Sequence, residues 1–83
     1  MVRKTENRKQ IVVVEAGWVF IGEPSKGEGH ITLHDASVVR VWGTTKGLGQ
    51  IALEGPTKDT ILDPSGVVDI PEGKVLFLLS CTY

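Results

Sequence analysis

The sequence has little of what several protein classes require. Its 83 residues include one cysteine, Cys81, so no internal disulfide can form and a disulfide-stapled secreted scaffold is excluded. No apolar run approaches the roughly 20 residues that a membrane helix needs. The first ten residues are basic, but the short apolar run that follows ends at an acid and does not match a signal peptide. We therefore expect a soluble cytoplasmic protein without membrane contact.

Charge divides the chain into two parts. Residues 1–10 hold four cations against one anion, whereas residues 11–83 hold five cations against nine anions. This predicts a basic flexible tail over 1–10 and a single β-rich domain over 11–83, short enough to be one domain. The tail is either a solvated terminus or an arm that touches phosphates. Because the body is acidic, we do not expect a nucleic-acid partner.

Composition of the body favours β structure. Valine and isoleucine occupy 16 positions between residues 11 and 83, and leucine occupies seven. Glycines and prolines cut these apolar residues into short runs, the pattern of a mainly β domain. We predict a small barrel or sandwich of about six short strands, with a polar loop at 25–29 and turns at 35–36 and 63–66. The strand segments are 11–14, 18–21, 30–34, 38–42, 60–62, 67–70 and 74–80.

One segment has helical spacing instead. Apolar residues at 48, 51, 52 and 53 predict one short α-helix near residues 45–54. Thr44 or Thr45 can act as the N-cap, and Gly55-Pro56 is a stop signal. Glycines at 47 and 49 disfavour a helix interior, so we expect about two turns that dock against the sheet.

Two predicted strands are apolar on both faces, namely 18–21 and 75–79. A strand of this kind needs a covering layer on each side. A domain of this size with one short helix can hardly supply both layers, and small domains often recover missing core by association. We therefore expect a homo-oligomer; the alternative is a closed small barrel with an uneven surface.

The run VVRVWGTTKGLGQ at residues 38–50 carries a resemblance. Together with EGPT at 54–57, Leu62-Asp63 and the upstream GWVFIG at 17–22, it is similar to a group of small uncharacterised proteins encoded by tailed phages and prophages. The resemblance spans residues 11–80. It implies a phage setting, in which accessory proteins of this size bind or block host components, and it carries over no catalytic residue.

The same run holds the best candidate site. Three glycines, two hydroxyls and a lysine lie where a strand is predicted to lead into a helix, and exposed backbone N–H groups there favour an anion. A guanidinium pairs with phosphate and an indole stacks on a base. The predicted ligand-binding residues are Arg40, Trp42, Thr44, Thr45, Lys46, Gly47 and Gly49. The alternative is structural: glycines shape a tight turn, a threonine caps the helix, and Trp42 packs in a core or interface. Whether Thr57, Lys58 and Thr60 approach the loop depends on topology.

Nothing in the sequence forms a catalytic set. The spacing of a Walker motif or dinucleotide fingerprint is absent. His30 and His34 share a strand face about 13 Å apart, too far for one metal ion. Cys81 has no neighbouring base, and the acids lie beside turn residues. We expect no enzyme, no cofactor and no metal. The predicted function is a non-enzymatic binding protein that sequesters a phosphate-bearing, nucleotide-like ligand such as a host defence signal; the alternative is a protein-interaction module that blocks a host protein or forms a small virion component.

Overall fold

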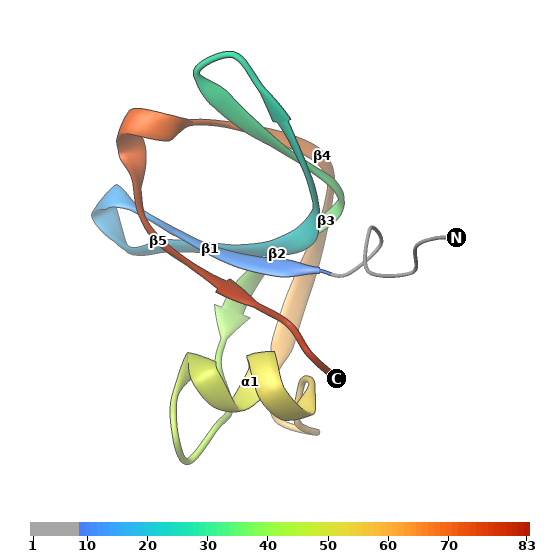
Figure 1. The fold of residues 1–83 in the computed structure, drawn as a ribbon. Coiled ribbons are helices and arrows are strands. Elements are labelled where there is room, and N and C mark those ends of the chain that lie inside the picture. Colours follow the sequence, from blue (N-terminus) through green and yellow to red (C-terminus); the bar gives the residue numbers. More distant parts are fainter. Residues whose placement is uncertain (1–8) are drawn as a thin grey trace.

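A computed structural model describes residues 9–83, which form one antiparallel sheet and one α-helix (Figure 1). Neighbouring strands follow the order β4-β3-β2-β1-β5. The elements are β1 (Gln10–Val14), β2 (Trp18–Gly27), β3 (His30–Val41), α1 (Leu48–Glu54), β4 (Ile61–Pro71) and β5 (Val75–Ser80). Short 3-10 turns at 15–17 and 72–74 connect β1 to β2 and β4 to β5. The prediction of a mainly β fold with one short α-helix is confirmed; the described residues contain five strands, where the sequence predicted about six.

The predicted tail, residues 1–10, lies mostly outside the described residues. Its last residue, Gln10, is the first residue of β1 and pairs with Gly22 of β2 and Ser80 of β5. The backbone carbonyl of Lys9 accepts a hydrogen bond of 3.0 Å from the amide of Cys81. Sheet pairing therefore begins at the end of the segment that the charge pattern marked as a tail.

Three strands bend at one level of the sheet. In β2 the bend lies at Gly22, where an added Cβ would come within 3.1 Å of Ala36. In β3 Asp35 has a φ of +50°, and in β4 Gly66 has a φ of +76°. Ala36 and Gly66 are partners, and the register shifts on either side of them. Because bulges bend strands and increase their twist, the sheet curls over on itself along this line (Figure 1).

These bends correct the predicted turns. The segments predicted as turns at 35–36 and 63–66 lie inside the continuous strands β3 and β4, and β2 continues to Gly27 through most of the predicted loop at 25–29. The connection between β2 and β3 is limited to Glu28 and Gly29. Glycine, proline and aspartate here mark the bends of long strands, because a bulge uses the same unusual backbone conformations as a turn.

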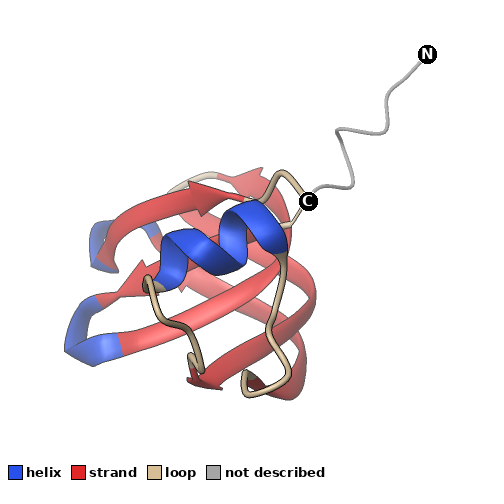
Figure 2. Ribbon diagram, turned by 90° about the horizontal axis from the view of Figure 1, so that it is seen from below, coloured by secondary structure: helices blue, strands red, loops and turns tan. Residues whose placement is uncertain are grey.

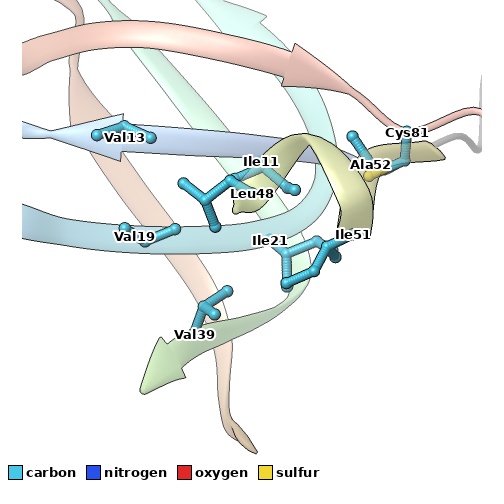
Figure 3. Packing of buried hydrophobic residues seen from close by; sticks show 9 residues of the cluster. All are labelled: Ile11, Val13, Val19, Ile21, Val39, Leu48, Ile51, Ala52 and Cys81. Atoms are coloured by element: carbon cyan, nitrogen blue, oxygen red, sulfur yellow. The ribbon is translucent and has the colours of Figure 1, made fainter. Parts of the chain in front are cut away.

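Strand β1, which lies between β2 and β5, is buried on both faces. On one face Ile11 and Val13 contact a core that α1 covers (Figure 3). On the other face Val12 packs within the curl of the sheet, in a second core whose buried members are Val12, Ile31, Leu33, Ala36 and Ile70. The helix supplies one layer and the curled sheet supplies the other. For β2 the cover is incomplete, because Val19 and Ile21 are buried on one face whereas Phe20 is half-buried and Trp18 is 55% exposed on the other.

The helix α1 is shorter than predicted. It begins at Leu48 instead of residue 45, and it ends at Glu54, followed by Gly55 with a φ of +91°. Leu48, Ile51 and Ala52 are buried against the sheet, which α1 crosses (Figure 2). Within residues 9–83 no helix has the length and apolar character to cross a bilayer.

Candidate functional site

The candidate segment begins at the end of β3, where Arg40 lies at a register shift between Val39 and Val41. The Nε of Arg40 donates a hydrogen bond of 2.7 Å to the carboxylate of Asp63 on β4. This hydrogen bond, and then the charge of Asp63, raise the pKa of the Arg40 guanidinium above its ordinary value. Arg40 is therefore held by its neighbouring strand, and both partners lie at the surface.

Backbone N–H groups of the glycine-rich loop converge on one oxygen atom. The amides of Thr45 and Lys46 donate to Oε1 of Gln50 at 3.1 and 2.9 Å, and the hydroxyl of Thr45 lies 3.3 Å from the same atom. The amide of Gly47 donates to Oγ1 of Thr44 at 3.0 Å. With these amides bonded to side chains, the helix begins only at Leu48. The sequence predicted that a phosphate oxygen would accept hydrogen bonds from this loop, and in the structure Gln50 Oε1 accepts them instead.

A second set of hydrogen bonds fastens the start of the loop to the chain after α1. The hydroxyl of Thr57 donates to the carbonyl of Gly43 at 2.6 Å, and that of Thr60 donates to the carbonyl of Trp42 at 2.7 Å. A Cβ on Gly43 would meet the backbone of Asp59 at 2.3 Å. The topology thus brings Thr57 and Thr60 to the predicted site, where they bind its backbone.

The remaining predicted residues lie at the surface of this loop. Lys46 is exposed, Trp42 is 44% exposed, and Gly49 is half-buried in the first turn of α1. A Cβ on Gly47 would lie 4.0 Å from the Trp42 ring, so Trp42 borders the loop. The segment therefore presents one indole and one ammonium group beside a backbone in which the N–H groups of Thr45, Lys46 and Gly47 already have acceptors.

The other side chains that could act in catalysis or metal binding have structural roles instead. His34 Nε2 lies 3.2 Å from the Ser25 hydroxyl, and His30 Nδ1 lies 3.2 Å from the carbonyl of Glu28. Burial raises the pKa of the Cys81 thiol, and the charge of Lys9 opposes this only in part. In the part of the chain that the structure describes, no three metal-ligating side chains lie together.

One apolar cavity, of about 280 Å³, opens beside the second core. Trp18 and Phe20 form one wall, with ring centroids 6.1 Å apart and planes at 11°. Its lining also includes Val14 of β1 and Val68, Ile70 and Pro71 of β4. This volume lies below the usual range for small-molecule sites, roughly 300–1,000 Å³, and its lining offers few polar groups to orient a ligand.

Among residues 9–83, the longest run of consecutive exposed large apolar side chains belongs to β5. Leu76, Phe77 and Leu78 are 60%, 51% and 41% exposed, and we call these three side chains the β5 surface. Neighbouring strands place β5 at one edge of the sheet, with β1 on its inner side. The sequence marked residues 75–79 as a strand lacking cover, and for β5 that expectation agrees with the exposure observed.

Gln50 and Asp63 are the two site residues that the sequence analysis missed. Gln50 lies three residues after the N-cap Gly47, the position from which a glutamine in a capping box reaches back to backbone N–H groups, so a local signal was present. Asp63 of β4 is the register partner of Val38 on the neighbouring strand β3, and only this register shows that Asp63 lies close to Arg40. No protein-family model matches this chain, and a search of curated proteins finds no significant match.

Proposed function

We propose that this chain is a non-enzymatic protein-interaction module that docks through the outer edge of β5. The observation that carries the proposal is the β5 surface, three consecutive large apolar side chains that are exposed along an edge strand, with Phe77 and Leu78 on opposite faces of the sheet. Large apolar side chains exposed on both faces of one edge are typical of a site that a partner covers.

The edge itself supports docking as much as its side chains do. An edge strand presents unpaired N–H and C=O groups that another strand can pair with. Natural proteins usually protect such edges with charge, proline or bulges. Val75–Ser80 contains no charged residue, no proline and no glycine, and its one register shift lies near its start, opposite Val13 and Val14. A strand of this composition favours β-augmentation, in which a partner adds a strand to the sheet.

The proposal includes a phage setting and a place in the cytoplasm of the host cell. The setting is supported by the resemblance of residues 38–50 to small phage and prophage proteins. The location is supported by Cys81, which is a buried free thiol and the one cysteine of the sequence. Within that setting the module either blocks a host protein or joins a small virion assembly.

Site-specific photocrosslinking in bacterial cells tests the proposal without assuming a partner. A benzoylphenylalanine residue in place of Leu76 should give covalent adducts with another polypeptide, because position 76 lies on the β5 surface. The matched control is the same residue in place of Val67, which is 62% exposed on β4, the opposite edge. Equal adduct yields at the two positions would overturn the proposal.

Capture of a phosphate-bearing ligand at residues 40–49 stays a prediction. A ligand oxygen there would have to replace Gln50 Oε1 at the amides of Thr45 and Lys46. Calorimetric titration with linear and cyclic nucleotides tests it. Binding tighter than about 100 μM that Lys46→Ala weakens about tenfold would favour sequestration over protein interaction, since charge-assisted contacts are worth roughly 1.5–3 kcal/mol.

A further inference from the structure

We propose that the strand that pairs with β5 is the β5 of a second copy of this chain, with Leu78 at the two-fold axis. The inference rests on the proposed function, which makes the β5 edge a docking site. It adds the partner, the register and the symmetry. The two sheets would then join into one continuous sheet of ten strands.

Backbone geometry determines the register. The Cys81 amide donates to the Lys9 carbonyl at 3.0 Å, so the backbone groups of residue 81 face β1. Successive residues of a strand direct these groups to alternate sides, and Leu79 faces Ile11 in the same pairing. The N–H and C=O groups of Leu78 and Ser80 therefore face outward. Antiparallel self-pairing centred on Leu78 lets the outward groups of both residues pair within β5 of the second copy and places Leu78 opposite Leu78, whereas a pairing centred on Phe77 would put Ser80 opposite Lys74, outside the strand.

Side chains of β5 are compatible with this pairing. The same register places Phe77 opposite Leu79 of the second copy and Leu76 opposite Ser80 of the second copy. Residues 75–80 carry no charge, so a two-fold arrangement brings no like charges together along the strand. Apolar cross-strand pairs of this kind stabilise an antiparallel sheet. The strand is thus complementary to itself.

The other edge of the sheet argues against an open filament. Pairing of β5 with β4 of the next copy would repeat head to tail without closing. β4 contains Pro64 and Pro71, which have no backbone N–H, and the charged residues Asp63 and Asp69. Such features protect an edge from pairing. β5 lacks them, which favours closure of two copies through β5 alone.

The strand is also held in place before it binds. The Thr82 amide, just beyond β5, donates to the carbonyl of Ala52 in α1 at 2.8 Å, and Cys81 is buried in the core beneath the helix. An edge anchored at its inner side and at its end loses little conformational freedom on pairing. The docking edge is therefore preorganised.

Sedimentation velocity of the purified chain tests the dimer. At about 200 μM, a concentration chosen because small interfaces are weak, the wild type should sediment as a dimer, with twice the 9.0 kDa of one chain. Leu78→Lys should be monomeric, because two lysines would face each other at the axis. Leu76→Lys is the second variant, since Leu76 is more exposed and its replacement spares the fold. Val67→Lys on β4 is the control and should remain dimeric.

Charge complementation then tests the register. Leu78→Lys and Leu78→Asp should each be monomeric, and an equimolar mixture should form a heterodimer, because residue 78 faces its own copy only in the two-fold register. A mixture that stays monomeric would overturn the register. A monomeric wild type would overturn the proposal that the partner is a second copy. The proposed function would still stand if photocrosslinking at position 76 then gave adducts to a different protein.

Discussion

Gly43 has a structural role in the segment that the sequence marked as a ligand site. Its φ is +63°, and its Cα faces the backbone of Asp59 so closely that a Cβ would come within 2.3 Å of a carbonyl carbon. The structural alternative given for this loop, in which glycines shape a tight turn, agrees with this contact, because the group that approaches Gly43 belongs to the chain itself.

Two alanine substitutions test whether Gly43 and Gly49 have different structural roles. Gly43→Ala should lower the free energy of unfolding by about 3 kcal/mol or more, since it combines a left-handed backbone with a backbone clash. Gly49→Ala is the matched control, because a Cβ there meets nothing within 4 Å and the position lies in α1. It should be neutral or stabilising by up to about 1 kcal/mol. Urea denaturation measures both, and similar losses in the two variants would contradict this assignment.

Cys81 gives a prediction about pH. Burial raises the pKa of its thiol above the ordinary value of 9.0, and partial burial together with the nearby Cys81 raises the pKa of Tyr83, which is 56% exposed, above 10.0. Above these ordinary values the unfolded chain loses protons that the folded chain retains, so the free energy of unfolding should fall as the pH rises from about 9 to 11. Urea denaturation across this range checks the direction.

The same burial should protect Cys81 from alkylation. Its reaction with iodoacetamide at pH 8 should be much slower in the native protein than in denaturant, because the thiolate is the reactive form. Cys81→Ala should show a smaller loss of stability at high pH than the wild type. Rapid native alkylation, or stability that rises with pH over this range, would contradict the burial of Cys81.

At the scale of elements, α1 forms because the sheet holds it. Seven residues are too few for a stable isolated helix. Ile51 is fully buried against β1 and β2, whereas Leu53, two residues later, is among the exposed apolar side chains. The helix therefore depends on one buried face.

Truncation on the two faces of α1 should differ widely. Ile51→Ala should cost about 2–5 kcal/mol, the range for large-to-small changes in a core. Leu53→Ala should change stability by no more than about 0.5 kcal/mol, as surface substitutions usually do. Thermal unfolding of the two variants compares them, and a cost at Leu53 equal to that at Ile51 would mean that the outer face of α1 is covered.

Element type was predictable from the sequence, and element length was not. The β-branched runs and the spacing of residues 48–53 indicate strands and one helix correctly. Asp35 and Gly66 suggested two turns, whereas each lies in a bend within a long strand. Turn and bulge use the same residues, and only pairing with a neighbouring strand, such as Ala36 with Gly66, distinguishes them.

At the scale of the whole molecule, the same sequence feature has two different outcomes. Residues 18–21 and 75–79 are both apolar on two faces, and the sequence treated them alike. The curl of the sheet and α1 together bury β1 and, in β2, Val19 and Ile21, but β5 lies at the edge and its side chains remain exposed, as does Trp18 at the start of β2. Strand order, which depends on contacts between distant residues, decides which apolar strand keeps an open edge.

The central claim is that the outer edge of β5 pairs with a second copy. Residue-resolved amide hydrogen exchange tests it most directly, because the amides of Leu78 and Ser80 face outward and no strand among residues 9–83 lies on that side of β5, whereas the amides of Phe77 and Leu79 face β1. The account predicts that protection of Leu78 and Ser80 rises with protein concentration, while Phe77 and Leu79 are protected throughout. Fast exchange of Leu78 and Ser80 at every concentration would contradict it.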